Sequence, residues 1–422
     1  MQVVLLAAGK SSRFYPFTNL KHKSLMKFMG MTLLEHTIVS IRESGIKDII
    51  IVVGTDPFIQ DLLGDGKDFK VKITYVVQTE SLGMGDALLR AQDHIKDYFF
   101  LLNAYHIEFA EFKSMMEAKK GRHGELVLLA RRDTRLHKYG FLNVDGDRVL
   151  DVIEKPALGQ TPSEYRVIGI YLLHKNLFPT LQNTVTEEYS FETALSQYAK
   201  ENRITMVVTD KQTVSLKYPW DAFEISDYLL AALPNFRGKN VTIAKNAVIQ
   251  GDVFIEDDVR ILEGACIKGP CYIGKGAIIG NNAIVRNGVV IGDNVIVGAN
   301  LELKHTILMD GSTTHSGLIL DSIIGEKCRI AGAVTVGNVR LDRKNIQVVV
   351  KGKEVDSGRR SLGVIMGDQV RTGLNVSTMP GIILGNNVIV GPSTTLMENV
   401  EHDTTVYAEF KHITKKHQQK KE

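Results

Sequence analysis

The stretch that decides the fold is VVLLAAGKSSRFYPFTNLKHKSLMKF, residues 3–28. Its apolar start, residues 3–7, has the composition of a short strand that is buried on both faces of a sheet. The polar residues 8–13 follow, and the backbone amides of such a small-residue run can approach a ligand closely. Because a loop of this kind after a first buried strand commonly holds phosphate, and because Arg13 and Lys23 flank it, it predicts a nucleotide site. An ordinary strand-to-helix turn with solvated charges is the alternative.

Strands and helices alternate over the first half of the chain. The apolar residues follow the period of a buried strand in some segments and the period of an amphipathic helix in others. This alternation predicts right-handed crossovers and an α/β fold with a mostly parallel sheet, in which ligands lie at the carboxyl ends of the strands. The predicted strands are residues 48–53, 71–77 and 98–102, and the predicted helices are residues 33–43, 58–63, 87–95 and 222–232.

The second half begins with an unbroken series of hexads, residues 241–312, among them VFIEDD, AIIGNN and VVIGDN. The third residue of every hexad is Ile, Val, Leu or Met, and the first is small or aliphatic. A strict period of six predicts a triangular coil with one short strand on each side, apolar residues inside and Gly, Asn or Asp at the corners. The register slips near residues 310–315 and breaks between 340 and 361, where residues 346–355 predict a projecting hairpin.

Composition narrows the class of protein. The chain has 422 residues and a net charge of +3, from 51 basic and 48 acidic residues, so we expect neither nucleic acid nor a membrane as a partner. The 3 cysteines are too few for a disulfide framework, and no apolar run is long enough for a membrane span, so we expect a cytoplasmic protein. The length allows an α/β domain at residues 1–233, a solenoid at 234–412 and a basic tail at 413–422.

The run LLAAGKSSRFYPFT, followed by His22 and Lys23, resembles the signature LAAGxGTRLxPLT…PK of the sugar-1-phosphate nucleotidylyltransferases. The resemblance implies a Rossmann-like nucleotidyltransferase domain in which a sugar-1-phosphate oxygen attacks the α-phosphate of a nucleoside triphosphate and releases pyrophosphate. Arg13 and Lys23 would neutralise the phosphate charge. Ser11 replaces a family glycine at a turn that favours a positive φ angle. The loop residues that the resemblance assigns to the nucleotide are Leu6, Ala7, Ala8 and Gly9.

Two further groups of residues match ligand positions of the same family. Residues 78–86 resemble its base-reading loop, in which an amide side chain offers a donor and an acceptor together. Other residues match positions that bind sugar hydroxyls through a carboxylate and the sugar phosphate through an ammonium group. The resemblance therefore assigns the base to Gln78, Gly83 and Met84, and the sugar phosphate to Gly140, Glu154 and Lys155.

The metal site departs from the family pattern. In the family, the strand that corresponds to residues 98–102 is followed by an aspartate that holds Mg²⁺, whereas this chain has Tyr105, and a phenol is a poor magnesium ligand. His106 and Glu108 are possible substitutes or plain surface residues. The motif YPWD resembles the closing motif of the family, so the resemblance implies that Asp221 is catalytic and binds the metal; a helix N-cap is the alternative.

Residues 321–382 look like the acetyltransferase half of archaeal-type bifunctional enzymes that synthesise UDP-N-acetylglucosamine. This resemblance implies a left-handed parallel β-helix that forms a homotrimer and binds acetyl-CoA between neighbouring subunits. His315 matches the histidine that deprotonates the amino sugar, a task that suits an imidazole, although a histidine in a polar loop is often simply solvated. Asn338 and Lys344 match positions that hold the amino sugar and its phosphate. Leu318 and Gln347 replace a family tyrosine and lysine.

Three hypotheses about function follow from these observations. The first is nucleotidylyl transfer from UTP or dTTP to glucose-1-phosphate or N-acetylglucosamine-1-phosphate, with acetylation of glucosamine-1-phosphate by the second domain. The second is a catalytically weakened protein that binds nucleotide sugars, because Tyr105 and Leu318 replace residues that the family uses. The third is acetyl transfer alone.

Overall fold

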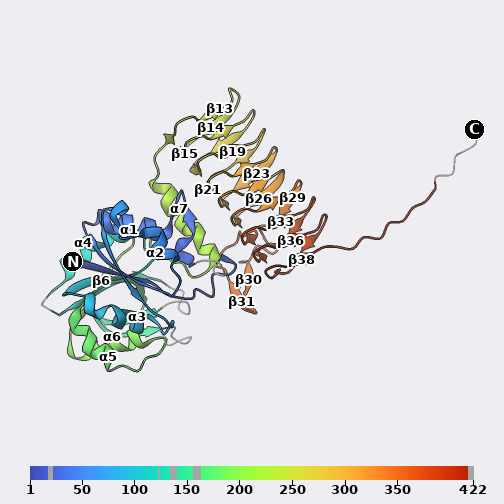
Figure 1. Ribbon diagram of the computed structural model, residues 1–422. Helices are drawn as coiled ribbons and strands as arrows, with labels where there is room; N and C mark the ends of the chain where they lie inside the picture. Colours follow the sequence, from blue (N-terminus) through green and yellow to red (C-terminus); the bar gives the residue numbers. More distant parts are fainter. Residues whose placement is uncertain (18–21, 122–123, 134–139, 155–162, 417–422) are drawn as a thin grey trace, which may run out of the picture. The chain divides into compact units, whose positions relative to one another are not determined.

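The computed structural model describes residues 1–17, 22–121, 124–133, 140–154 and 163–416. The chain divides into two compact units, one of residues 1–14 and 18–228 and the other of residues 15–17 and 229–422 (Figure 1). Within the described residues, no helix is both long and apolar enough to cross a membrane.

The first unit is built on one nine-stranded sheet with the order β5-β4-β1-β6-β10-β7-β11-β9-β8. The four strands β5, β4, β1 and β6 are parallel, and β1 lies between β4 and β6. From β1 the chain adds β4 and β5 on one side of the sheet and β6 on the other, so the order of the strands reverses at β1. Ligands of α/β sheets bind at such points. The bounds are β1 Gln2–Ala7, β4 Asp48–Val53, β5 Lys72–Val77, β6 Tyr98–Asn103, β7 Leu126–Arg132, β8 Gly140–Asp145, β9 Arg148–Glu154, β10 Tyr165–His174 and β11 Ile204–Val208.

Helices cover both faces of this sheet and create two apolar cores. One core joins the sheet to α1 (Leu33–Glu43), α2 (Phe58–Leu63) and α4 (Phe109–Lys119). The other joins it to α3 (Met84–Ala91), α5 (Phe178–Gln182) and α6 (Ser190–Glu201). The helix α7 (Ala222–Ala232) follows later in the chain. Because helices cover both faces of the sheet, the central strands have apolar residues at consecutive positions, and polar and apolar residues do not alternate along them.

The predicted α/β elements are confirmed, with two differences. The helix predicted at residues 87–95 begins at Met84 and ends at Ala91, because Gly83 and Met84 already turn into the helix. The sheet is parallel through β5, β4, β1 and β6 and again between β7 and β11, and its other pairings are antiparallel. The strand β10 runs antiparallel to both of its neighbours, β6 and β7. The strands β8 and β9 form a hairpin, because a two-residue turn, residues 146–147, joins them.

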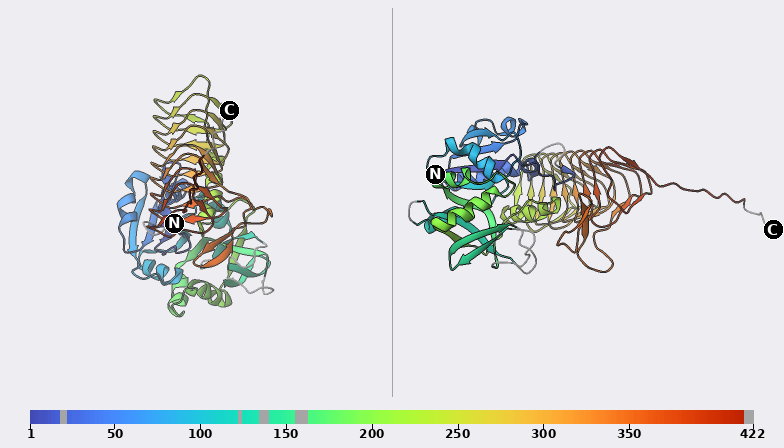
Figure 2. Two further views of the ribbon diagram at one scale, coloured as in Figure 1. Left: turned by 90° about the vertical axis from the view of Figure 1, so that its right-hand side faces the viewer. Right: turned by 90° about the horizontal axis from the view of Figure 1, so that it is seen from below.

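The second unit is the predicted left-handed parallel β-helix, whose stacked coils are visible in Figures 1 and 2. Three sheets run along it, from β12 (Phe236–Arg237) to β35 (Ile383–Leu384), from β13 (Thr242–Ile243) to β38 (Thr405–Val406) and from β14 (Val248–Gln250) to β37 (Thr395–Leu396). Thr242 pairs with Arg260, so one coil takes 18 residues, which is three hexads. The first and third residues of the hexads form the inner core.

The two breaks in the hexad register are also confirmed. Glu302 pairs with Leu318, so the coil that contains residues 310–315 is shorter than the preceding ones. Ile323 pairs with Ile365, and the extra residues of that coil include a hairpin of β30 (Gln347–Val350) and β31 (Lys353–Asp356). Interruptions of this kind leave a solenoid on one face, where loops commonly carry function.

The inner core predicts a large difference between two matched substitutions. The side chain of Ile279 is 0% exposed inside the coil, whereas Ile296 is 41% exposed. Ile279→Ala removes buried methyl groups and leaves a cavity, so it should lower the free energy of unfolding of the β-helix by about 2–5 kcal/mol. Ile296→Ala should cost less than about 1 kcal/mol. Denaturant titration that follows the unfolding of the β-helix measures the free energy of unfolding of both variants. Equal decreases would contradict the conclusion that Ile279 points into the coil.

Candidate active site

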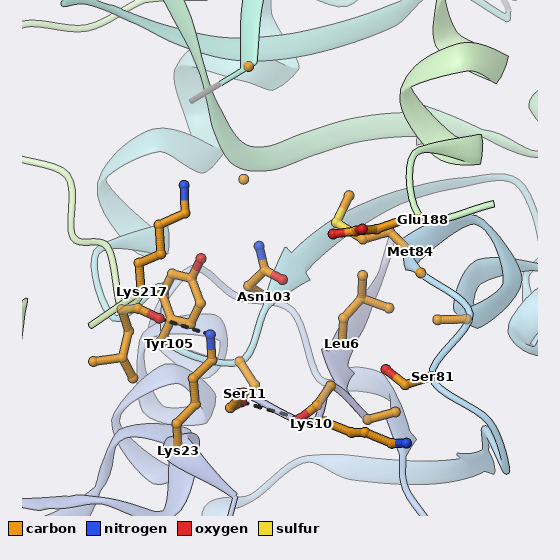
Figure 3. A pocket seen from close by; sticks show the side chains of 18 of the residues that line it. Leu6, Lys10, Ser11, Lys23, Ser81, Met84, Asn103, Tyr105, Glu188 and Lys217 are labelled. Carbon is orange, nitrogen blue, oxygen red and sulfur yellow. Dashed lines mark hydrogen bonds between the residues drawn. The ribbon is translucent and has the colours of Figure 1, made fainter. Parts of the chain in front are cut away.

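A cavity of about 680 Å³ lies in the first unit, where the carboxyl ends of β1, β5 and β6 meet. Its lining comes from segments far apart in the sequence: the loops after β1 and β5, the end of β6, the start of α6 and residues 214–217. Figure 3 shows Lys23, Tyr105 and Lys217 on one side and Ser81, Met84 and Glu188 on the other. We call these sides the phosphate end and the base end.

The residues that the sequence predicts for the nucleotide, the sugar phosphate and the metal fall into two groups, those that line this cavity and those that do not. Most of them line it, which brings together residues from both predicted loops and from the sugar-binding group. Ala7 is 2% exposed, belongs to the core and does not line the cavity, and neither does Asp221. Lys155 lies outside the described residues. The residues that line the cavity as predicted are Leu6, Ala8, Gly9, Arg13, Lys23, Gln78, Gly83, Met84, Gly140 and Glu154.

The loop after β1 forms the floor of the cavity and has the backbone that the sequence predicts. Ser11 has a φ of 49°, in the left-handed region that favours the glycine of the family signature. Its hydroxyl donates to the carbonyl of Gly9 at 3.2 Å, and its own carbonyl accepts from the amide of Phe14 at 2.8 Å. These local bonds compensate for a conformation that a serine rarely adopts.

The phosphate end is rich in cations. Lys23 Nζ donates to the carbonyl of Leu216 at 2.8 Å and lies 4.9 Å from the ring centroid of Tyr105. Burial, followed by the nearby charge of Arg13 and to a smaller extent that of Lys217, lowers the pKa of Lys23 to about 8, against the opposing effect of the Asp221 carboxylate. A cluster of positive groups that repel one another is ready to accept a polyanion, because the bound anion removes the repulsion.

The carboxylate of Asp221 accepts hydrogen bonds from the backbone of its own turn. Its Oδ2 accepts from the amides of Lys217 and Tyr218 at 2.6 and 2.8 Å, at the start of the 3₁₀ helix Pro219–Asp221. Burial raises the pKa of this carboxyl to about 6. Asp221 therefore caps the N-terminus of this helix, which is the alternative role that the sequence predicts for it.

The residues at this end fit a protein-bound Mg²⁺ poorly. The partner position after β6 is the phenol of Tyr105, and hard cations prefer several carboxylate or carbonyl oxygens. Among the residues with described positions, no group of three or more His, Cys, Asp or Glu side chains could hold a metal ion.

His106 and Glu108 are buried, so the hypothesis that they are surface residues is wrong. His106 is 2% exposed and Glu108 is 1% exposed. His106 Nδ1 is 3.1 Å from Glu108 Oε1, which also accepts from the amide of Val214 at 3.1 Å. His106 lines the cavity, and its Nε2 has no hydrogen-bond partner. The carboxylate therefore orients an imidazole whose second nitrogen can meet a ligand.

The base end is organised by Gln78 and Gly83. The buried side chain of Gln78 donates from Nε2 to Asp86 Oδ2 at 2.8 Å and to the carbonyl of Gly83 at 3.2 Å. Both partners are acceptors, so the amide nitrogen must point at them, and the carbonyl oxygen of Gln78 remains for a ligand. Gly83 has a φ of 97°, and a Cβ there would lie 2.7 Å from the carbonyl oxygen of Glu188.

Two residues that the resemblance assigns to the sugar phosphate, Gly140 and Glu154, lie near a buried ion pair. A Cβ on Gly140 would lie 2.5 Å from Glu154 Oε2, so this position brings backbone and carboxylate close together. Arg166 also lines the cavity and is 3.2 Å from Asp133 Oδ2 through Nη1. Sequence reasoning missed Arg166, as it missed Lys217, although Lys217 directly precedes the YPWD motif and a basic residue there is a visible signal.

The second unit contains a separate candidate site near the breaks in the hexad register. Asn338 Nδ2 donates to Asp321 Oδ2 at 2.6 Å, and Asp321 is also 3.2 Å from His305 Nδ1 and 3.4 Å from Lys304 Nζ. Asp321 is 3% exposed. Burial acts to raise the pKa of Asp321, but the hydrogen bonds from His305 and Asn338 hold it below its usual value. This network fixes the side chain of Asn338.

Lys344 lines a second cavity of about 510 Å³ with a strongly basic wall. His315 is exposed, and neither His315 nor Asn338 lines that cavity, so a single chain does not bring the three predicted residues together there. The cavity suits an anion because its cations far outnumber its one carboxylate. Its other lining residues are Arg340, Arg343, Asn345, Gln347, Asp356 and Arg360.

Comparison with known proteins agrees with both halves. The nucleotidyl transferase family matches residues 2–220, and a domain described as the GMPPB C-terminal domain matches residues 267–406. A protein named bifunctional protein GlmU from Methanococcus maripaludis is 35% identical over 422 residues, which cover 96% of this chain and 97% of the relative. A bifunctional sugar-1-phosphate nucleotidylyltransferase/acetyltransferase from Sulfurisphaera tokodaii is 29% identical and covers 95% of this chain and 98% of its own.

Solved structures are more distant. A UDP-glucose pyrophosphorylase complexed with UDP-glucose aligns with 55% of this chain and 99% of its own, at 20% identity and a TM-score of 0.48. Nothing about activity follows at that level of similarity.

The lowered pKa of Lys23 predicts a pH dependence of triphosphate binding. In the unliganded protein Lys23 loses its proton as the pH rises through about 8, whereas a bound anion favours the charged form. Above that pH, binding requires uptake of a proton, so the affinity for UTP should fall by up to about tenfold per pH unit. Calorimetry between pH 7 and 9 measures this fall. Lys23→Met should bind more weakly with no such slope, and an unchanged wild-type affinity across the range would contradict the assignment.

Proposed function

We propose that this chain makes nucleotide sugars. It belongs to the nucleotidyl transferase family and, over nearly all of its length, to the bifunctional GlmU proteins. The reaction is transfer of a nucleotidyl group from UTP or dTTP to glucose-1-phosphate or N-acetylglucosamine-1-phosphate, with release of pyrophosphate. The observation that carries the proposal is the cavity at the carboxyl ends of β1, β5 and β6, which joins a cation-rich end to a base end. A cavity of this size accommodates a nucleotide and a sugar phosphate.

Gln78 supports the choice of base. Its amide nitrogen is engaged by Asp86 and Gly83, so its carbonyl oxygen is the atom that meets a base. Uracil and thymine present an N3–H donor, as guanine does at N1, whereas the equivalent ring nitrogens of cytosine and adenine carry no hydrogen. Cytosine and adenine offer donors only on an exocyclic amino group, so they must shift to reach this oxygen or leave it unpaired. An unpaired buried acceptor costs about 1–3 kcal/mol, so CTP and ATP should bind more weakly than UTP or dTTP.

The transfer step needs charge neutralisation and alignment more than proton transfer. An oxygen of the sugar-1-phosphate attacks the α-phosphorus, the bond from the α-phosphorus to the bridging oxygen breaks, and pyrophosphate leaves in line with the attack. The attacking oxygen is already ionised, so no general base is required. Arg13 and Lys23 lie at the cavity end where negative charge accumulates, and they stabilise it without reorganising.

We include Mg²⁺ in the proposal as an ion of the transfer reaction that no side chain of this cavity would hold. The sequence assigned a metal to Asp221, but this carboxylate caps the turn of residues 217–221 and the cavity wall contains Tyr105 instead of a second carboxylate. The proposed reaction therefore has no step that uses a metal held by protein side chains.

The second activity that we propose is acetyl transfer from acetyl-CoA to glucosamine-1-phosphate by the β-helix. His315 would remove a proton from the amino group, Asn338 would hold the sugar and Lys344 its phosphate. The basic wall around Lys344 and the fixing of Asn338 by Asp321 support these roles. We propose a homotrimer, because in one chain His315 does not line the cavity that contains Lys344, and a neighbouring subunit can complete such a site.

Tyr105 favours one alternative, a protein that binds nucleotide sugars with weakened catalysis. The cavity has cations and a base end, while Tyr105 occupies the position where the family resemblance implies a metal-binding carboxylate. Binding without turnover is the behaviour expected of such a site.

Pyrophosphate release tests the first activity. With Mg²⁺ present, UTP or dTTP together with N-acetylglucosamine-1-phosphate or glucose-1-phosphate should release pyrophosphate. CTP and ATP should react at least about tenfold more slowly, because they have no ring N–H for the carbonyl oxygen of Gln78. Lys23→Met should lower kcat/KM by about 100-fold or more. Lys200→Met, which changes an exposed lysine of α6, is the control. Tight nucleotide binding with no pyrophosphate from any pair would favour the binding protein.

Release of CoA tests the second activity. Glucosamine-1-phosphate and acetyl-CoA should yield free CoA, and His315→Ala should slow the reaction by about 100-fold or more, as loss of a general base does. His412→Ala changes an exposed histidine outside the candidate site and should leave the rate unchanged. No CoA release from the wild-type protein would refute acetyl transfer, and equal effects of the two variants would refute the role of His315.

A further inference from the structure

The phosphate end of the cavity has a charge arrangement opposite to that of a metal site. A site for Mg²⁺ needs oxygen ligands with net negative charge on the protein. Here Arg13, Lys23 and Lys217 line the cavity, and Tyr105, a phenol, follows β6. The acidic group whose charge acts on Lys23 is the carboxylate of Asp221, which does not line the cavity. A divalent cation that approaches this end without a nucleotide meets repulsion from these cations.

The carboxylate that remains nearby is committed to the backbone. Asp221 Oδ2 accepts from the amides of Lys217 and Tyr218 at 2.6 and 2.8 Å, which are short hydrogen bonds to a charged acceptor. These bonds close the N-terminus of the 3₁₀ helix Pro219–Asp221 and hold the backbone of Lys217 at the cavity wall. Asp221 therefore acts by positioning Lys217.

Lys23 is positioned to contact a polyphosphate directly. An ammonium group has three donors, and Lys23 gives one of them to the carbonyl of Leu216 at 2.8 Å. The Tyr105 ring, 4.9 Å from Nζ, supports the side chain from one side by a cation–π contact. Figure 3 shows Lys217 and Lys23 on the same side of the cavity, with Tyr105 next to both. The remaining donors of Lys23 are available to phosphate oxygens.

We propose that this site binds the polyphosphate as a metal-free anion, with the ammonium groups of Lys23 and Lys217 in the place of a divalent cation held by the protein. Tyr105 is the specificity-determining residue, because it removes the carboxylate that would bind a metal and supports Lys23 instead. The inference rests on the proposed function, since it concerns the same cavity, but it changes which groups neutralise the triphosphate. Magnesium then competes with the lysines for the phosphate oxygens rather than bridging them to the protein.

Calorimetry at constant ionic strength and neutral pH tests the proposal with two probes, inorganic tripolyphosphate and UTP. Both should bind the full chain in excess EDTA, and an excess of Mg²⁺ should leave the Kd unchanged or weaken it. Binding that is absent in EDTA and appears with Mg²⁺, or that tightens at least about tenfold with Mg²⁺, overturns the inference and leaves the proposed function intact. Failure of UTP to bind under either condition overturns the inference and the proposed function together.

Three variants separate the residues. Lys217→Met should weaken tripolyphosphate binding in EDTA by about tenfold, as loss of one desolvated cation does, whereas Lys200→Met on the exposed end of α6 should not. Tyr105→Asp should reverse the sign of the Mg²⁺ effect, because its carboxylate neutralises the lysines and supplies a metal ligand. Tyr105→Phe keeps the ring beside Lys23 and should behave as wild type. A Tyr105→Phe protein that binds only with Mg²⁺ would contradict the role given to the ring.

Discussion

The burial of Lys23 beside two further cations, Arg13 and Lys217, is the constraint on which the site depends. These cations are brought together by the fold, because they come from the loop after β1 and from the segment before α7, which are distant in sequence. Without an anion, burial and then the repulsion from Arg13 and Lys217 lower the pKa of Lys23 to about 8. A triphosphate removes the repulsion, so the same feature that destabilises the unliganded site favours the liganded one.

The rest of the first unit serves to hold that cluster. The apolar strand β1 is buried by α1, α2 and α4 on one face and by α3, α5 and α6 on the other, which fixes where its carboxyl end lies. The turn around Ser11 then exposes backbone amides at the floor of the cavity, and Asp221 fixes the backbone of Lys217 at its wall. At the opposite end, Asp86 fixes the amide of Gln78, whose oxygen is the group that we propose selects the base. Binding, alignment and selectivity thus derive from groups that are oriented before the ligand arrives.

The sequence was most informative where a pattern repeats or an order of residues is specific. The hexads predicted the β-helix and both interruptions, because a period of six has few structural interpretations. The signature around Gly9 and Arg13 predicted the loop after β1, including the left-handed backbone at Ser11. The helix at residues 84–91 was misplaced by a few residues, because Gly83 and Met84 have weak helix signals of their own.

Tertiary contacts explain what the sequence did not reveal. The burial of His106 and Glu108 depends on the amide of Val214, which is far away in the chain. Lys217 and Arg166 reach the cavity only because the strands bring their segments to one edge of the sheet. The commitment of Asp221 to two amides is a matter of local geometry that a motif does not encode.

The account depends on where a triphosphate sits, and a crystal structure of the protein with UTP in the presence of Mg²⁺ measures this directly. The account predicts phosphate oxygens in contact with the ammonium groups of Lys23 and Lys217, and the uracil N3–H directed at the carbonyl oxygen of Gln78. A triphosphate bound away from both lysines, or a divalent ion coordinated by Asp221 with its two amide bonds broken, would contradict it.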